Sequence, residues 1–106
     1  MATRAKAKAK TGPAAPLAIL GGGNMGVSIA RGLVAAGSHA PGDIILTRRQ
    51  YQLLEPLARE GFVVQKDNRD AVRKARVVIL AVRPQQLTDL LEEIAGAVSP
   101  ARHLII

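Results

Sequence analysis

The most informative stretch of this chain is Ala18-Ile19-Leu20-Gly21-Gly22-Gly23-Asn24-Met25-Gly26. A short apolar run leads into a glycine-rich turn, and a pattern typical of a helix follows at once. Gly21, Gly23 and Gly26 match G-x-G-x-x-G, with an expected strand before them and an expected helix after them. Because this context is what makes the pattern specific, the stretch predicts a dinucleotide-binding turn.

Each of the three glycines has its own task in such a turn. Gly21 permits the sharp change of direction from strand to helix, and Gly23 lets the main chain approach a pyrophosphate without a Cβ in the way. Gly26 lets the helix pack closely against the sheet. The N–H groups and the positive dipole end of the helix then face the phosphates.

The composition predicts one small domain with an aliphatic core. The chain has 106 residues, of which 48% are hydrophobic, but it contains one Phe, one Tyr and no Trp. Such a core is typical of a buried parallel sheet covered by helices. The absence of cysteine excludes disulfides and thiolate metal sites. No apolar run approaches the roughly 20 residues that span a membrane, so we expect a cytoplasmic protein without a membrane partner.

Much of the net charge of +7 lies at the beginning of the chain. Four positive charges come from Arg4, Lys6, Lys8 and Lys10. We expect residues 1–16, which contain no acid, to form a disordered basic tail ahead of one domain over residues 17–106. The segment lacks the apolar centre of a signal peptide, and a transit peptide stays an alternative although the segment has no Ser. The rest of the chain has only a small net positive charge, and aromatic residues are scarce throughout, so we do not expect it to bind nucleic acid.

After this tail, segments typical of strands alternate with segments typical of helices. We expect strands at 17–20, 44–47, 62–64, 76–82 and 104–106. We expect helices at 24–36, 50–60, 68–74 and 85–97. Pro56 should shorten or kink the second helix, and either Asp67 or Asn68 can cap the third. The inward faces of the second and fourth helices should carry Leu53, Leu54, Leu57, Ala58, Leu87, Leu90, Leu91 and Ile94.

This alternation predicts an α/β fold, a Rossmann-like doubly wound parallel sheet that is truncated after about five strands. The expected strand order is 3-2-1-4-5, which places the first and fourth strands side by side. A ligand then binds across the carboxyl ends of these two strands. Both the glycine turn and Arg83-Pro84 lie at that edge.

The end of the second strand indicates which dinucleotide binds. An NAD site usually carries Asp or Glu about 20 residues beyond the glycines. Here the strand ends in Thr47-Arg48-Arg49 without an acid. Guanidinium groups bind a 2′-phosphate in charge-assisted pairs, and Thr47 adds a hydroxyl. We therefore expect NADP(H) to be preferred, with NAD(H) as the alternative, and Arg49 is the arginine that a solvated turn explains equally well.

The glycine turn, Asn68 and Ala81-Val82-Arg83-Pro84 together resemble the amino-terminal part of pyrroline-5-carboxylate reductase. That family has a G-x-G-N-M-G-type turn and an Ala-Val-Lys-Pro loop after the fourth strand. Arg83 replaces the usual lysine of this loop. The stretches 29–33 and 41–44 are also similar to the family, so the resemblance extends over nearly the whole expected domain.

The resemblance implies an oxidoreductase that reduces 1-pyrroline-5-carboxylate, a small cyclic imine carboxylate, to L-proline in the last step of proline biosynthesis. It implies a pyrophosphate site lined by Leu20, Gly21, Gly22, Gly23, Asn24, Met25 and Gly26. The adenosine 2′-phosphate would meet Thr47 and Arg48, and the adenine ribose would lie near Asn68. The nicotinamide side would be bordered by Ala81, Val82, Arg83 and Pro84.

The family also has a second, helical domain, which forms the dimer and supplies most of the substrate pocket. We expect this chain alone to be inactive, and to form a homo-oligomer only if that domain is present. Two alternatives stay open. One is a stand-alone NADP(H)-binding or sensing module without catalysis, and the other is a different small-molecule NADP-dependent oxidoreductase, such as a deazaflavin-linked or 3-hydroxyacid enzyme.

No catalytic acid or base can be nominated from the sequence. We expect His39 and His103 at the surface, and Lys66, Asp67 and Asp70 as solvated charges around a helix start. No cluster of His, Asp and Glu has the spacing of metal ligands, so we expect no metal site.

Overall fold

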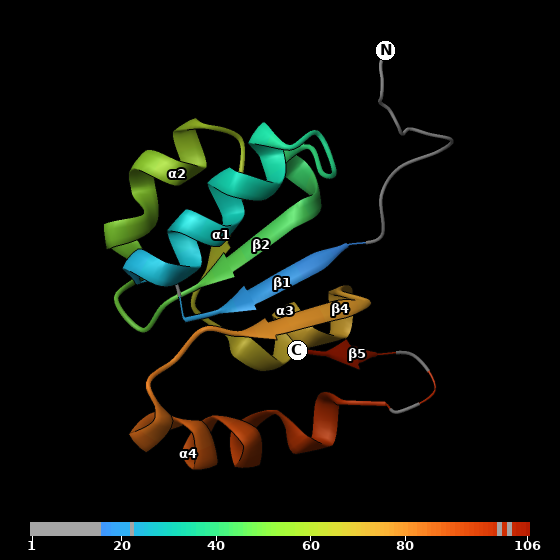
Figure 1. The fold of residues 1–106 in the computed structure, drawn as a ribbon. Helices are drawn as coiled ribbons and strands as arrows, with labels where there is room; N and C mark the ends of the chain where they lie inside the picture. Colours follow the sequence, from blue (N-terminus) through green and yellow to red (C-terminus); the bar gives the residue numbers. More distant parts are fainter. Residues whose placement is uncertain (1–15, 22, 100, 102) are drawn as a thin grey trace.

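A parallel sheet with helices on both faces forms the protein in the computed structural model, which describes residues 16–21, 23–99, 101 and 103–106 (Figure 1). The strands pair in parallel in the order β3-β2-β1-β4-β5. Their bounds are Leu17–Leu20 for β1, Ile44–Thr47 for β2, Val63–Gln65 for β3, Val77–Leu80 for β4 and Leu104–Ile105 for β5. The expected fold class and strand order are confirmed.

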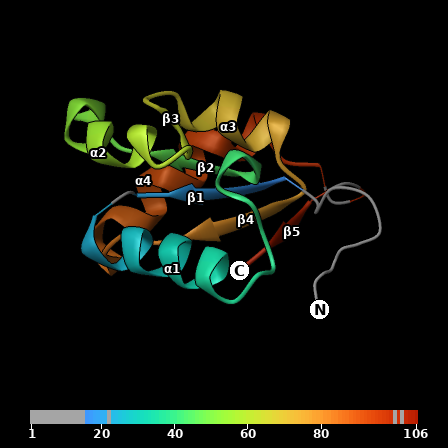
Figure 2. The same ribbon diagram turned by 90° about the horizontal axis from the view of Figure 1, so that it is seen from above.

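In the described part of the chain, four α-helices connect these strands. They are α1 (Asn24–Ala35), α2 (Glu55–Arg59), α3 (Asn68–Lys74) and α4 (Pro84–Ile94). Short 3-10 turns lie at Pro41–Asp43, Tyr51–Leu54 and Ala95–Ala97. The turned view shows α1 and α3 on opposite sides of the sheet (Figure 2). None of the helices in the described part of the chain is long and apolar enough to cross a membrane.

The central strand β1 explains why the sheet is covered twice. All four of its residues are buried. Leu17 and Ile19 pack in one cluster with side chains from α1 and α2, while Ala18 and Leu20 pack in the other with side chains from α3 and α4. Since successive residues of a strand point to opposite faces, an unbroken apolar run satisfies both layers.

The segment expected to form one helix over 50–60 is instead a 3-10 turn followed by the short helix α2. Pro56 lies in the first turn of α2, where its missing N–H costs no helical hydrogen bond. Leu54 and Leu57 are buried as expected, but Leu53 is exposed. The expectation for Leu53, and for the exposed Ala58, was wrong because the tighter 3-10 turn changes the helical phase before α2 begins.

The inward face of α4 is narrower than its sequence indicates. Leu90 and Ile94 are buried against α3 and the sheet, whereas Leu87 and Leu91 are 36% and 43% exposed. The expectation that all four point inward was therefore wrong. One stripe of residues four apart is enough to dock this helix, and the neighbouring stripe stays outside.

Smaller differences concern the ends of elements. β3 begins at Val63 rather than at residue 62, although Phe62 is buried, and β4 covers four residues of the expected 76–82. The expected basic tail lies outside the described residues except for Pro16. The carbonyl oxygen of Pro16 accepts hydrogen bonds from the N–H groups of Arg76 and Val77, at 2.9 and 3.3 Å.

Candidate dinucleotide-binding site

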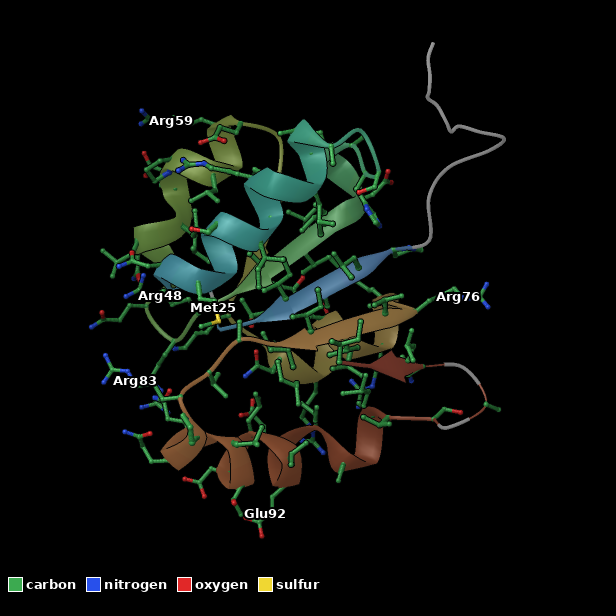
Figure 3. The ribbon with its side chains drawn as sticks, viewed as in Figure 1. Met25, Arg48, Arg59, Arg76, Arg83 and Glu92 are labelled. Atoms are coloured by element: carbon green, nitrogen blue, oxygen red, sulfur yellow. The ribbon has the colours of Figure 1, made fainter. Side chains whose placement is uncertain are left out.

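A cleft of about 960 Å³ opens at the carboxyl ends of the central strands. Figure 3 shows Met25, Arg48 and Arg83 at this end of the sheet, whereas Arg76 lies at the opposite end. β1 and β4 are neighbours in the sheet, but the helices that follow them, α1 and α4, pack on opposite faces. In open α/β sheets this switch point is where ligands bind.

Gly21 holds the turn after β1 in a conformation that other residues rarely adopt. Its φ is +97°, and a Cβ added to it would lie 2.7 Å from both the carbonyl oxygen of Ala81 and Cγ1 of Val82. Its N–H donates to the carbonyl oxygen of Thr47 at 3.2 Å. The turn is therefore fixed between the end of β2 and the loop after β4, as expected for a strand-to-helix turn.

Gly26 and Gly23 face opposite surroundings. A Cβ on Gly26 would lie 2.5 Å from the carbonyl oxygen of Gly21 and 3.2 Å from Cγ2 of Ile19 in β1, so the close packing expected of the helix on the sheet is confirmed. A Cβ on Gly23 would meet no heavy atom within 4 Å. Gly26 thus serves the fold, while Gly23 borders the open space of the cleft. Gly22 lies outside the described residues.

The start of α1 is open. Gly23 precedes it in an extended conformation, no side chain caps it, and its first turn contains no acid. The first N–H groups of an α-helix have no acceptor within the helix. Those at the start of α1 therefore carry partial positive charge beside the cleft, which Asn24 and Met25 line.

The start of α3 is closed by a side chain, and the start of α4 is closed only in part, because no side chain accepts from its first N–H groups. At α3, Oδ1 of Asp67 accepts from the N–H groups of Arg69 and Asp70, at 2.9 and 3.2 Å. At α4, Pro84 has no N–H, and the N–H of Arg83 donates to Oε1 of Gln86 at 3.3 Å. Asp67 rather than Asn68 is thus the cap, which leaves the Asn68 side chain for other partners.

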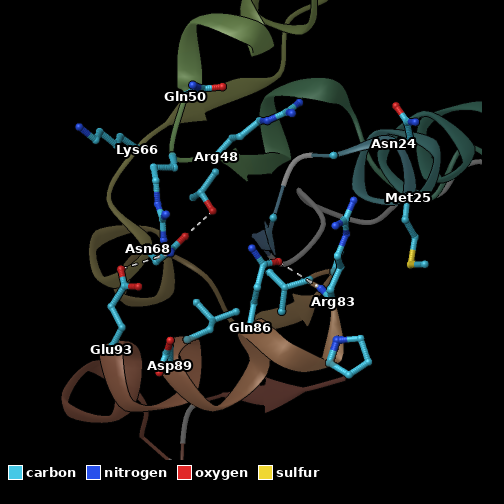
Figure 4. A pocket seen from close by; sticks show the side chains of 18 residues that line it. Asn24, Met25, Arg48, Gln50, Lys66, Asn68, Arg83, Gln86, Asp89 and Glu93 are labelled. Carbon is cyan, nitrogen blue, oxygen red and sulfur yellow. Dashed lines mark hydrogen bonds between the residues drawn. The ribbon is translucent and has the colours of Figure 1, made fainter.

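Asn68 joins two walls of the cleft (Figure 4). Its Oδ1 accepts a short hydrogen bond from the hydroxyl of Thr47, and its Nδ2 donates to Oε2 of Glu93 at 3.2 Å. Thr47 is fully buried. The hydroxyl of Thr47 therefore reaches the cleft through the amide of Asn68, and its contact with a 2′-phosphate stays a prediction.

Most of the residues expected at the site line this cleft. They are Gly21, Gly23, Asn24, Met25, Thr47, Arg48, Asn68, Ala81, Val82, Arg83 and Pro84. The side chain of Leu20 does not line the cleft, because it is fully buried in the core among α3 and α4 residues. Its carbonyl oxygen accepts from the N–H of Ala81 at 2.9 Å, which holds the loop after β4 against the glycine turn.

Several further lining residues were missed or dismissed in the sequence. They are Arg49, Gln50, Lys66, Gln86, Asp89, Leu90 and Glu93. Lys66 follows β3, whose carboxyl end lies beside that of β2, so the strand order was the signal that placed it here. Arg48, Arg49 and Lys66 make one side of the cleft basic, whereas Asp89 and Glu93 of α4 are acidic.

Neither histidine lines the cleft. We expected His103 at the surface, and this was wrong. It is half-buried, and its Nδ1 accepts from the N–H of Ser99 at 2.9 Å. Its Nε2 lies 2.8 Å from the carbonyl oxygen of Val72 and therefore carries the proton that it donates there. His103 ties the loop before β5 to α3.

Comparison with known proteins agrees with this geometry. The family model described as NADP oxidoreductase, coenzyme F420-dependent, matches residues 16–106. The chain belongs to this family. Pyrroline-5-carboxylate reductase 1 of Dictyostelium discoideum is 46% identical over 90 residues, which cover 85% of this chain and 16% of that protein.

Two solved structures are similar to this member of the NADP oxidoreductase family. A pyrroline-5-carboxylate reductase from Coxiella burnetii matches with a TM-score of 0.78 and 34% identity, over 86% of this chain and 34% of that one. The Plasmodium falciparum pyrroline carboxylate reductase with NADP bound matches with a TM-score of 0.71 and 18% identity, over 86% and 32%, which shows the fold alone. The chain spans about a third or less of these relatives.

Proposed function

We propose that this chain is the NADP(H)-binding part of a pyrroline-5-carboxylate reductase. The observation that carries the proposal is the open start of α1 behind the glycine turn, at the switch point of the sheet. The reductases among the relatives supply the reaction, which is reduction of 1-pyrroline-5-carboxylate to L-proline. When bound, NADPH supplies the hydride.

The residues of the cleft suit the parts of the dinucleotide in order along the edge of the sheet. We assign the pyrophosphate to the N–H groups at the start of α1, beside Gly23, where no side chain intervenes. We assign the 2′-phosphate to Arg48, with Arg49 and Lys66 on the same side. Asn68 serves the adenine ribose, and residues 81–84 border the nicotinamide.

Hydride transfer also needs the imine held against the nicotinamide ring, so positioning accounts for much of the catalysis. Because the chain spans 34% of the Coxiella burnetii reductase, we expect the groups that orient the substrate, and the surface that forms a homo-oligomer, in the remainder of such an enzyme. We also expect the protein to act in the cytoplasm, which subcellular fractionation tests.

Cofactor preference is tested by titrating NADPH and NADH into the wild-type chain and into an Arg48→Ala/Arg49→Ala variant. Loss of charge-assisted hydrogen bonds worth about 1.5–3 kcal/mol each should weaken NADPH binding roughly tenfold or more, relative to NADH. An Arg73→Ala/Arg76→Ala variant removes the same charge from exposed positions that do not line the cleft, and should bind like the wild type. An unchanged ratio in the first variant contradicts the preference, and no binding by the wild type contradicts the whole proposal.

The reaction is tested with a chimera that joins this chain to the remainder of the Coxiella burnetii reductase. NADPH oxidation is followed with 1-pyrroline-5-carboxylate and, for comparison, with a 3-hydroxyacid and NADP⁺. Turnover of the imine by the chimera, and not by the 106-residue chain, is the expected result. A folded chimera that binds NADPH but turns over neither substrate would favour a binding or sensing module.

A further inference from the structure

Glu93 places a negative charge in a cleft that we assign to a polyanion. It lies in α4, is exposed, and lines the cleft together with Asp89 one turn earlier. A carboxylate near phosphates weakens their binding by charge repulsion. The contact of Glu93 with Asn68 can offset this repulsion if it improves how Asn68 binds the ligand.

The side-chain amide of Asn68 can occupy its site in two orientations that exchange oxygen and NH₂ group. Thr47 cannot select between them, because a hydroxyl either donates to the oxygen or accepts from the NH₂ group. A carboxylate only accepts. Glu93 therefore determines the orientation: its Oε2 accepts from Nδ2 at 3.2 Å, and Oδ1 is left to accept from Thr47.

This orientation sets what Asn68 presents to a ligand. One N–H of Nδ2 is donated to Glu93, and among the described residues no acceptor takes the second, which is available to a ligand in the cleft that Asn68 lines. An N–H suits the oxygen atoms of a phosphorylated ribose, whereas a carbonyl oxygen in the same place would repel them. The buried Thr47 and the exposed Glu93 thus hold the amide at its oxygen and at its nitrogen. Figure 4 shows the contact between Asn68 and Glu93.

We infer that Glu93 is a positioning residue, which fixes the Asn68 amide as a hydrogen-bond donor toward the adenosine ribose of NADP(H). The inference rests on the proposed function. It assigns to an acidic residue a favourable effect on the binding of an anion, and this opposes the effect of its charge alone.

The opposite signs make the inference testable by titration of NADPH into four variants. Glu93→Ala should weaken binding about fivefold, although it removes a negative charge, and Glu93→Lys should weaken it at least as much, because an ammonium group only donates. Glu93→Gln, which can still accept from Nδ2, should recover most of the affinity. Glu92→Ala removes the same charge from an exposed position of α4 outside the cleft, and should bind like the wild type (Figure 3).

A double-mutant cycle with Asn68→Ala separates positioning from charge. In that background Glu93→Ala should no longer weaken binding, and thermal unfolding of the single Glu93 variants should match that of the wild type because the side chain is exposed. In the chain that keeps Asn68, tighter or unchanged NADPH binding by Glu93→Ala and Glu93→Lys would overturn the inference and leave the proposed function intact. Absence of dinucleotide binding by the wild type would instead remove the proposed function.

Discussion

The helices α1 and α4 follow the two central strands of the same sheet, yet their first turns are built differently. α1 begins behind Gly23, with no side-chain cap and no acid in its first turn. α4 begins with Pro84 and with Gln86 folded back onto the N–H of Arg83. α3, by contrast, is closed by the carboxylate of Asp67. The fold brings several helix starts to one edge, and the local sequence decides which of them can take an anion.

The side-chain cap, which α3 has and α1 lacks, affects stability in one helix and leaves room for binding in the other. A side-chain cap contributes about 1 kcal/mol to a helix, and glycine at the same position contributes less than Asp, Asn or Ser. α3 uses this contribution, whereas α1 leaves its first N–H groups for water or a ligand. We therefore expect substitutions at α1 and at α3 to change different properties of the protein.

The largest effect should come from the two glycines that pack the turn itself. Gly26→Ala forces a Cβ to 2.5 Å from the carbonyl oxygen of Gly21, which should lower the free energy of unfolding by about 1–3 kcal/mol. Gly21→Ala adds backbone strain at φ +97° to a similar overlap and should cost about 2–5 kcal/mol. Urea unfolding measures both.

Gly32→Ala is the matched control within α1. A Cβ there meets nothing within 4 Å, so this variant should gain about 0.5–1 kcal/mol from helix propensity. If Gly26→Ala unfolds at the same urea concentration as the wild type, the turn has room for a Cβ at this position, and the close packing that we describe is contradicted.

Gly23→Asp gives α1 the kind of start that α3 has. The site has an extended backbone and open space, so the new carboxylate should cap the helix and leave stability equal or a few tenths of a kcal/mol higher. NADPH affinity should fall by at least about tenfold, because the carboxylate then stands beside the pyrophosphate. Gly23→Asn, an uncharged cap of the same shape, should weaken binding less. Undiminished affinity in the Asp variant, measured by titration calorimetry, contradicts the assignment of the pyrophosphate.

Asp67→Ala makes the converse change and opens α3. We expect a loss of about 1 kcal/mol in unfolding free energy, since two N–H groups lose their acceptor. Asp67→Ser should restore most of this loss. NADPH affinity should stay within about twofold of the wild type, and a larger change in affinity than in stability would mean that the start of α3 takes part in binding.

The smallest effect concerns how much the ion pairs of α1 and α3 contribute to stability at low pH. Arg31 of α1 pairs with Glu60 beyond α2 at 2.6 Å, whereas Asp70 of α3 pairs with Lys74 of the same helix at 2.8 Å. The hydrogen bond from Arg31 lowers the pKa of Glu60, and those from Lys74 and Gln65 lower the pKa of Asp70. Each pair stabilises the protein above the unfolded pKa of its acid and loses that contribution as the pH falls through the folded pKa.

Glu60→Gln should therefore lower stability slightly at pH 7 and flatten the decline of stability below the ordinary pKa of a glutamate, 4.5. Unfolding free energies between pH 7 and pH 3 measure this, with Glu92→Gln as the control at an exposed position of α4. An equally steep decline in both variants and in the wild type would show that the link from α1 to Glu60 contributes nothing.

Those parts of the fold and site that depend on local sequence could be predicted. The bounds of β1 and β2 follow from apolar runs bounded by turn residues, and the task of Gly26 follows from its place in the glycine pattern. The strand order follows from the alternation of strands and helices together with the handedness of crossovers. The cleft then had to lie beside the glycine turn.

The features that could not be predicted from the sequence depend on contacts between segments that are far apart in the chain. Thr47, Asn68 and Glu93 lie 21 and 25 residues apart along the chain, and only the packing of α3 and α4 on the sheet brings them together. The exposed Leu87 and Leu91 were missed for a related reason, because an apolar pattern does not tell how wide a face the neighbouring elements cover.

The most direct test of the open helix start is an NMR titration of the ¹⁵N-labelled chain with NADPH. We expect the largest backbone amide shifts at Asn24, Met25 and Gly26, with smaller ones at the starts of α3 and α4. The same titration of Gly23→Asp should move these three amides little. Shifts centred on Asn68–Lys74 or Pro84–Ile94, or none at the start of α1, would contradict binding of the pyrophosphate at the start of α1.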